Sequence, residues 1–436
     1  MMLFLKKWSP VSILLFLIMA SGCREDLSVN NNDQFFPLTL RTEAGNDKVQ
    51  LSWDRANVST FEKYVLVRSR SPIPVGLRPT FSSGDFEIVM QTDDPDSLSF
   101  RDDALPVVEE LYYKVYVGFN DRFAESDAVK IGFDNLLIDG NGGVAKFIPG
   151  TNWIILGDEF TQTLSVVDYQ TKQTLVKRSV SFTNSDNMCL DVAVENGQNV
   201  LYWWAGYNNF FKFTLPDLNQ IGFWSVPFSG FSVLAGDDKI YTTQYDYNQS
   251  FTVRRKNDMS VVEAHYRTDY YTHRTLAYLD KGTNLMVEAS PYRVLVYNVN
   301  STTGSVSNLR EKTTNTFSVF NRDLPVSNNG QYFIPQFDGL VYDRNLNQIG
   351  NIPLQNGGYT DAEFSQDDEY LYVLSQDFAF GGSLITKFKF PSMDLVATKR
   401  FNNVSPRVLN ITGNGVIFVG NGVNGLNKVL VKKLEF

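Results

Sequence analysis

Cysteine and histidine are almost absent from this chain, which has two of each among its 436 residues. Two cysteines, Cys23 and Cys189, are too few for a disulfide framework or a cysteine-rich metal site. The two histidines, His265 and His273, lie in no recognisable catalytic or zinc motif. GxSxG, HExxH and a glycine-rich phosphate loop before a helix are also missing. The sequence therefore predicts no catalytic residues of these classes, no metal and no cofactor.

Basic runs and helix signals are missing as well. The formal net charge is −9, and no cluster of lysine and arginine occurs, so we exclude nucleic acid as a partner. Aromatic residues make up 14% of the chain, and with few helical patterns beside them they indicate an all-β protein.

The first residues have the pattern of a secretion signal. Lys6 and Lys7 form a positive region, and the apolar run 11–20 is shorter than the ~20 residues that a membrane-spanning helix needs. The string Ala20-Ser-Gly-Cys23 follows and resembles the lipobox of bacterial lipoproteins, with Ala20 in place of the usual leucine. The resemblance implies that 1–22 is removed and that Cys23 carries lipid, palmitate included. The alternative is an ordinary secreted protein that is cut nearby.

The residues after Cys23 indicate where the lipoprotein resides. Arg24 occupies the position at which aspartate often retains lipoproteins in the inner membrane. Glu25 and Asp26 resemble the surface-export signal of one Gram-negative phylum, so we expect a lipid-anchored outer-membrane protein that faces the cell exterior. Removing 22 of 436 residues leaves 414, enough for two or three domains, after an asparagine-rich tether at 23–35.

Residues 36–132 alternate apolar and polar side chains in roughly seven short strands, which is typical of a β-sandwich. The segments Val49-Gln-Leu-Ser-Trp53, Tyr64-Val-Leu-Val-Arg-Ser69 and Leu111-Tyr-Tyr-Lys-Val-Tyr-Val117 resemble a fibronectin type III domain. The resemblance makes Trp53 the core tryptophan and places Tyr113 at the tyrosine corner. It implies a spacer or binding module with no shared active site, and core packing accounts for the residues named.

One short motif in this region indicates a modification. Asp96-Ser97-Leu98 resembles an O-glycosylation site of exported proteins, which makes Ser97 a candidate acceptor. A turn before a strand explains the same three residues.

Residues 133–436 repeat one pattern of four strands seven times. A polar turn precedes each apolar second strand, and these strands begin near Trp153, Leu201, Ile240, Leu285, Tyr332, Tyr370 and Val416. A period of about 40–45 residues with four strands per unit is the signature of a β-propeller blade. The clearest copy, 163–168 with the Asp-x-x-Thr turn after it, resembles the YVTN surface propeller repeats. We therefore predict an all-β chain with a sandwich followed by a seven-bladed propeller.

The seventh repeat stops after its third strand, at 427–436. A ring with one short blade would expose unpaired backbone groups at its edge. We therefore expect a strand near 133–139 to fill the gap, and the sandwich to join the propeller rigidly with almost no linker.

Aromatic residues are concentrated in the loops that a propeller gathers on one face, those between second and third strands and those between blades. Tyrosine among small polar residues is typical of adaptable recognition surfaces. The candidate binding face comprises Phe160, Tyr207, Tyr245, Tyr247, Tyr270, Tyr271, Tyr292, Phe337, Tyr359, Phe378 and Phe380. The alternative is that these rings pack between blades, as we expect for one of Trp203 and Trp204.

Carboxylates on the same loops leave acid-pair chemistry open, because such chemistry needs only two of them at the right separation. The candidates are Asp158, Glu159, Asp246, Asp269, Asp338 and Asp377. A calcium site built from these loops also stays open, although no EF-hand spacing occurs.

These features favour a non-catalytic binding or scaffold subunit that docks a protein of an outer-membrane transport or assembly complex through its loop face. The membrane contact would be the lipid anchor. A surface lipoprotein that binds or degrades glycans, as a lyase or hydrolase, is the alternative. Adhesion or gliding is a third role, which the sequence does not separate from the first.

Overall fold

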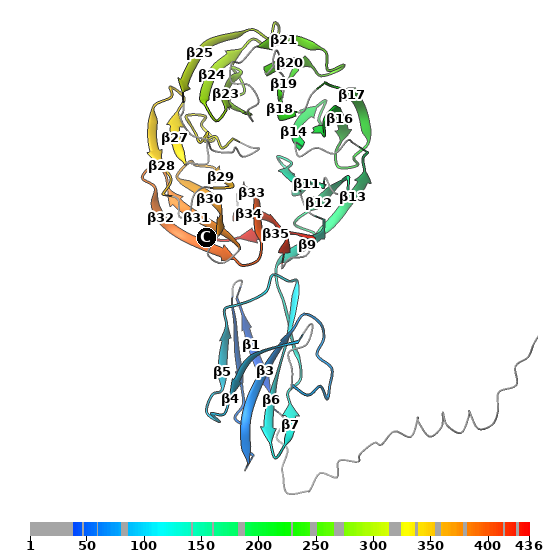
Figure 1. Cartoon of the computed structure of the whole chain (residues 1–436), viewed down its shortest axis with the longest axis vertical. Helices are drawn as coiled ribbons and strands as arrows, with labels where there is room; N and C mark the ends of the chain where they lie inside the picture. Colours follow the sequence, from blue (N-terminus) through cyan, green and yellow to red (C-terminus); the bar gives the residue numbers. More distant parts are fainter. Residues whose placement is uncertain are drawn as a thin grey trace, which may run out of the picture. The chain divides into compact units, whose positions relative to one another are not determined.

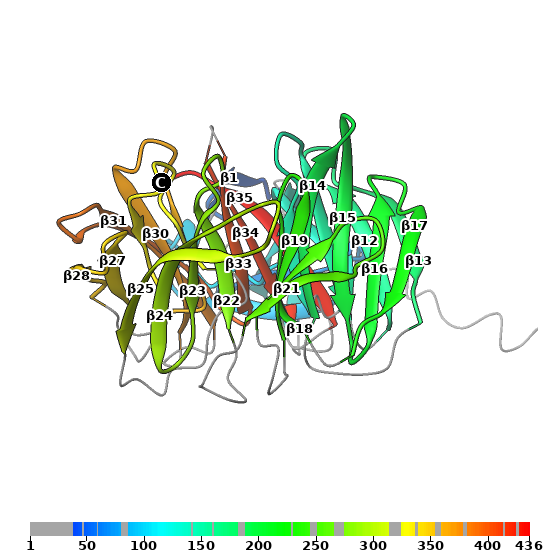
Figure 2. The same ribbon diagram turned by 90° about the horizontal axis from the view of Figure 1, so that it is seen from above.

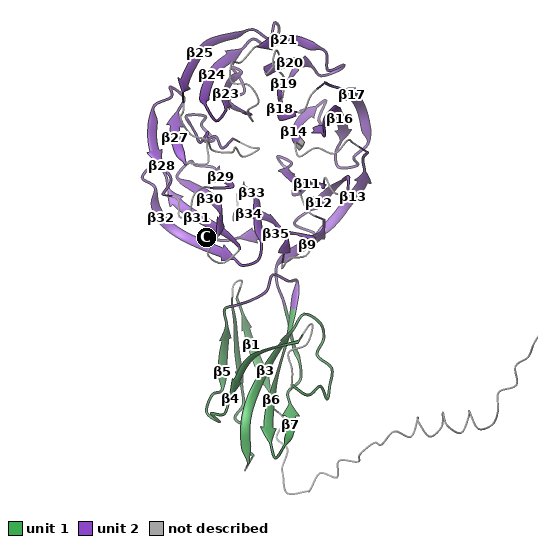
Figure 3. Cartoon of the chain, viewed as in Figure 1, with its two compact units in different colours: residues 1–103, 111–131 green, residues 104–110, 132–436 purple. Residues whose placement is uncertain are grey.

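The computed structural model describes residues 38–45, 48–58, 60–79, 86–140, 143–158, 161–181, 188–227, 230–244, 251–265, 274–313, 324–335, 339–353, 359–377, 382–412, 415–423 and 427–436. Every element named within these ranges is a β-strand, which confirms the all-β prediction. No helix in them is long and apolar enough to cross a membrane. The chain divides into two compact units, Met1–Asp103 with Leu111–Ile131 and Ala104–Glu110 with Gly132–Phe436 (Figure 3).

The first unit has two antiparallel sheets. One has the order β1-β2-β5, made of β1 (Leu40–Ala44), β2 (Val49–Trp53) and β5 (Ser99–Asp102). The other has the order β4-β3-β6-β7, with β8 also paired to β6, and is made of β3 (Phe61–Ser69), β4 (Phe86–Thr92), β6 (Glu110–Phe119), β7 (Arg122–Glu125) and β8 (Val129–Gly132).

Strand alternation builds the core of this unit. Along β2, Val49, Leu51 and Trp53 are buried, whereas the residues between them are half-buried. The core also holds a charge. The Arg68 guanidinium donates to Asp102 Oδ2 at 2.7 Å, and the Tyr113 hydroxyl donates to the same oxygen at 2.8 Å. This pairing satisfies a carboxylate that burial would otherwise destabilise.

The second unit is a ring of seven antiparallel sheets in the part of the chain that the structure describes (Figure 1). The first sheet contains β10 (Val144–Phe147), β11 (Trp153–Asp158), β12 (Thr163–Asp168) and β13 (Gln173–Ser179). The second contains β14 (Met188–Glu195), β15 (Gln198–Ala205), β16 (Asn209–Thr214) and β17 (Gln220–Ser225). The third contains β18 (Gly230–Ala235), β19 (Lys239–Gln244), β20 (Phe251–Arg255) and β21 (Val261–His265).

The next three sheets continue around the ring in chain order. The fourth sheet contains β22 (Thr275–Asp280), β23 (Leu285–Ala289), β24 (Arg293–Val299) and β25 (Val306–Thr313). The fifth contains β26 (Tyr332–Phe333), β27 (Leu340–Asp343) and β28 (Gln348–Asn351). The sixth contains β29 (Asp361–Phe364), β30 (Tyr370–Asp377), β31 (Gly382–Lys389) and β32 (Asp394–Phe401). In the fifth sheet, a single antiparallel bridge between Val326 and Phe333 lies where the other sheets have a first strand.

The seventh sheet combines the two ends of the unit. It has the order β33-β34-β35-β9, from β33 (Ser405–Thr412), β34 (Gly415–Asn421), β35 (Lys428–Leu434) and β9 (Asn135–Asp139). The last pairing is antiparallel and places Leu137 opposite Leu430. The strand that completes this sheet thus comes from the segment before the first sheet.

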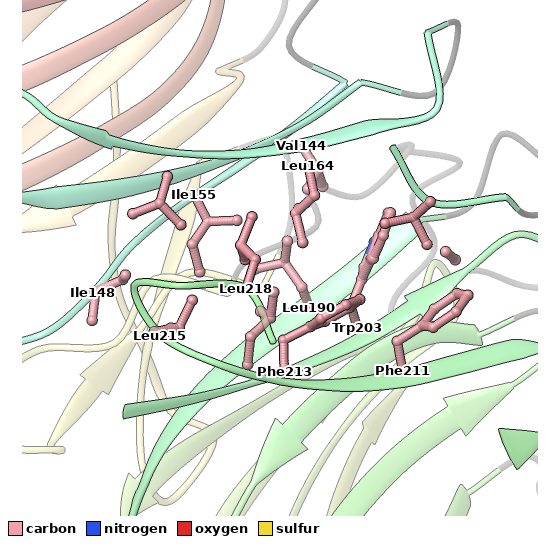
Figure 4. Packing of buried hydrophobic residues seen from close by; sticks show 14 residues of the cluster. Val144, Ile148, Ile155, Leu164, Leu190, Trp203, Phe211, Phe213, Leu215 and Leu218 are labelled. Atoms are coloured by element: carbon pink, nitrogen blue, oxygen red, sulfur yellow. The ribbon is translucent and has the colours of Figure 1, made fainter. Parts of the chain in front are cut away.

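A hydrophobic cluster fills each seam between neighbouring sheets. Trp203 packs with Ile155 and Leu164 between the first and second sheets (Figure 4), whereas Trp204 packs with Ile240 between the second and third. Both indole side chains are fully buried. Because successive side chains of a strand point to opposite faces, each central strand contributes to two seams.

Candidate functional site

The strands of the second unit run between two ends (Figure 2). The side chains at these two ends differ in chemistry. At one end, here named the turn end, the first strand turns into the second and the third into the fourth. Asp168 Oδ1 accepts hydrogen bonds from the backbone amides of Gln170 and Thr171, both at 2.9 Å. Asn300 accepts two amides of its own turn in the same way. These side-chain oxygens hydrogen-bond to the backbone of their own turns and so stabilise the turn conformation.

Carboxylates of the turn end are held in their charged form. The hydroxyl of Ser365 donates to Asp367 at 2.6 Å, and this bond, with a second from the Glu369 amide, lowers the pKa of Asp367. The hydroxyl and amide of Ser260 lower the pKa of Asp258 likewise. Such groups stay ionised near neutral pH and are unsuited to proton donation.

The opposite end, here named the loop end, carries the connections between second and third strands. Tyr207 follows β15 and Tyr292 follows β23, so the topology places both at this end of the second and fourth sheets. The exposed fraction is 52% for Tyr207 and 42% for Tyr292. Both predicted contact residues therefore have rings accessible to a partner.

One predicted residue of the binding face was wrong. Tyr359 is 3% exposed and packs in the cluster between the fifth and sixth sheets, where its hydroxyl donates to the Ile334 carbonyl at 3.4 Å. Its ring fills a seam, which is the alternative that sequence reasoning left open. The remaining predicted contacts lie outside the described residues: Phe160, Tyr245, Tyr247, Tyr270, Tyr271, Phe337, Phe378 and Phe380.

A buried ion pair lies near the loop end, between the third and fourth sheets. Arg274 Nη1 lies 3.5 Å from Glu288 Oε1, and both side chains are 3% exposed. The Tyr297 hydroxyl donates to Glu288 at 2.9 Å, and the Thr243 hydroxyl donates to the Arg274 carbonyl at 2.8 Å. The Glu288 carboxylate is thus paired within its own blade, and the Thr243 bond links the third sheet to the residue before β22, so this arrangement is structural in character.

The acids considered for catalysis are partly described. Asp158 lies in the first sheet and accepts the Thr161 amide at 3.2 Å, whereas Asp377 lies in the sixth and pairs with Arg400 at 2.6 Å. Glu159, Asp246, Asp269 and Asp338 lie outside the described residues. Within the described ranges, no group of three or more histidine, cysteine or acidic side chains could hold a metal ion.

Other residues singled out from the sequence occupy structural positions. The ring of His265 contacts Phe251, and its Nε2 lies 3.0 Å from the Gly304 carbonyl oxygen. Ser97 is half-buried in the turn before β5, where its amide donates to the Asp94 carbonyl at 3.2 Å. Cys23 and His273 lie outside the described residues.

Comparison with solved structures identifies the ring. The β-propeller domain of Cps50 (Swd1) from Myceliophteria thermophila aligns with a TM-score of 0.53 and 10% identity, over 68% of this chain and 98% of that one. Hydrazine synthase from Kuenenia stuttgartiensis aligns with a TM-score of 0.52 and 12% identity, over 68% and 97%. The second unit is a β-propeller. At such identity the likeness shows the propeller fold alone. No protein-family model and no curated protein matches the sequence.

Adjacent blades of this propeller are tied at matching positions, which sequence reasoning missed. Asp191 in the first strand of the second blade accepts the Ala235 amide of the third at 2.7 Å. The hydroxyl of Ser232 accepts the Leu276 amide of the next blade at 3.2 Å. Asp361 accepts the Leu409 amide across the sixth and seventh blades at 2.7 Å. The available signal was a short polar residue between apolar neighbours in a first strand, as at Asp191 and Ser232.

Proposed function

We propose that this chain is a non-catalytic surface lipoprotein that binds a protein of an outer-membrane transport or assembly complex through the loop end of its propeller. The observation that carries the proposal is the contrast between the two ends. At the turn end, side chains such as Asp168 and Asn300 bond within their own turns, whereas Tyr207 and Tyr292 are exposed at the loop end. Exposed tyrosines on a rigid scaffold suit a protein interface.

The first unit would act as a spacer between the lipid and the propeller. Its strand orders, β1-β2-β5 and β4-β3-β6-β7, and its buried Trp53 support the proposed fibronectin type III architecture. A spacer of this kind needs no chemistry of its own. Labelling cells with radioactive palmitate tests the anchor: the native chain should incorporate label, and Cys23→Ser should not.

Affinity capture of the lipidated chain from solubilised outer membranes tests the binding role. We expect a β-barrel protein to co-purify in stoichiometric amount with the native chain. The double variant Tyr207→Ser/Tyr292→Ser should retain at least tenfold less of it. Ile221→Ser is the matched control, because Ile221 is 53% exposed but lies on the outer strand β17. Equal capture by the native chain and the tyrosine variant would refute a loop-end interface.

A further inference from the structure

A hollow of about 680 Å³ opens at the turn end of the propeller, opposite the candidate binding face. Its walls come from the first blade (Phe147, Tyr169), the seventh (Asn410, Lys433) and the sixth (Gln366). The volume falls within the range of ~300–1,000 Å³ that small-molecule sites occupy. No residue of this hollow belongs to the interface proposed above.

One wall of the hollow is aromatic. The rings of Phe147 and Tyr169 meet edge to face with centroids 6.2 Å apart, and both are half-buried against the cluster between the seventh and first blades. Burial, together with the nearby charge of Asp168, raises the pKa of Tyr169. Both effects favour the protonated hydroxyl, which can donate a hydrogen bond.

Several polar side-chain groups around this wall have no hydrogen-bond partner among the described residues. The side-chain amides of Asn410 and Gln366 and the hydroxyl of Tyr169 make no hydrogen bond to any described residue. Asn152 donates to Gln170, which leaves the Asn152 carbonyl and the Gln170 amino group available. In turns of other blades, by contrast, Asn300 and Asp343 bond to the backbone of their own turns.

Two charged residues line the hollow, Asp134 and Lys433, and they differ in whether an oppositely charged partner lies nearby. Asp134 lies 2.8 Å from Lys172, so its charge is compensated. Lys433 has no carboxylate partner among the described residues that line the hollow or surround it. One unpaired ammonium group therefore faces an otherwise neutral set of amides and aromatic rings.

We propose that this hollow binds a short glycan, with a sugar ring against Tyr169 and Phe147 and with its hydroxyls bonded to Asn410, Gln366 and Asn152. Each amide offers a donor and an acceptor, which matches neighbouring hydroxyls that both donate and accept. The aromatic faces cover the apolar C–H face of the sugar. A nucleic acid would need several cations, and the hollow offers one. Lys433 favours a sugar that carries a carboxylate.

The test uses the full mature chain with Cys23→Ser, applied to an array of neutral and uronate-containing oligosaccharides of two to six sugars, followed by titration calorimetry with the best ligand. We expect Tyr169→Ala and Asn410→Ala to weaken binding at least tenfold. Tyr169→Phe should weaken it less than Tyr169→Ala, because the ring remains. Lys433→Gln should reduce the preference for uronate over its neutral counterpart at least threefold.

Tyr207→Ser is the matched control at the loop end and should bind the glycan as the native chain does. The glycan site and the protein interface are therefore tested independently of each other. Circular dichroism of each variant verifies that the fold is kept. Absence of binding across the array would overturn the proposal, and so would unchanged affinity in folded Tyr169→Ala. An unchanged uronate preference in Lys433→Gln would overturn the role of that lysine.

Discussion

The carboxylate of Asp361 accepts a hydrogen bond from the backbone amide of Leu409 at 2.7 Å, across the boundary between the sixth and seventh blades. Its other oxygen accepts the Ala362 amide at 2.9 Å, and the residue is 6% exposed. One side chain therefore satisfies two buried backbone donors on different blades, and this arrangement leads to the first prediction.

Asp361→Ala should lower the free energy of unfolding by about 2–3 kcal/mol, because two buried amides lose a charged acceptor. Denaturation in urea, followed by tryptophan fluorescence, measures the change. Asp238→Ala is the control: Asp238 is exposed in a turn of the third blade, and its loss should stay within about 0.5 kcal/mol. Equal effects of the two substitutions would contradict the role of the inter-blade bond.

Gly330 should tolerate no side chain. Its φ is +64°, and a Cβ there would lie 1.8 Å from the Leu279 carbonyl oxygen of the preceding blade. We expect Gly330→Ala to destabilise the protein by more than about 2 kcal/mol. Two effects contribute at Gly330: the positive φ and the clash with Leu279. Gly197→Ala tests the first effect alone, because Gly197 has φ +80° with nothing within 4 Å. We expect that substitution to destabilise the protein by about 1 kcal/mol. Thermal unfolding of both variants gives the comparison.

Acid should destabilise the propeller through its turns. The bonds from Ser365 and Ser260 hold the pKa values of Asp367 and Asp258 below the ordinary 3.8. A depressed carboxyl pKa contributes stability above pH ~4 that is lost as pH falls through the folded-state value. The decrease in Tm between pH 5 and pH 2.5 should be smaller in Asp367→Asn/Asp258→Asn than in the native chain. An identical decrease would show that these turns do not contribute.

Cys189 should be protected from thiol reagents in the folded protein. Its side chain is 6% exposed and packs in the cluster between the second and third blades, beside Trp204. In a Cys23→Ser background, Ellman's reagent should react with the native state at least a hundredfold more slowly than with the chain in urea. Fast reaction without denaturant would mean that this seam opens readily.

The propeller could be predicted from the sequence because its central strands are buried on both faces. Such strands appear as unbroken apolar runs between turn residues, as Leu201–Ala205 after Asn196-Gly197 illustrates. The predicted starts at Trp153, Leu285 and Tyr370 coincide with the first residues of β11, β23 and β30. The fibronectin type III assignment of the first unit stays a prediction.

Placement of individual side chains was harder to predict. Tyr359 lies in a connection, and nothing local distinguishes a ring that faces solvent from one that reaches Ile334, 25 residues earlier. The inter-blade bonds join residues 44 to 48 positions apart, a distance at which one sequence holds no pairing signal. The turn-end hollow could not be predicted for the same reason, because the residues that line it are spread along the sequence from Asp134 to Lys433.

The pairing of β9 with β35 also bears on how the protein is made. The partner strand of residues 135–139 is synthesised about 290 residues after them. Until then, the emerging polypeptide carries an unmatched strand and an incomplete circle of apolar seams, both prone to aggregation. Its biogenesis should therefore depend on holding chaperones, and a chain that lacks β35 should leave a product that the cell degrades.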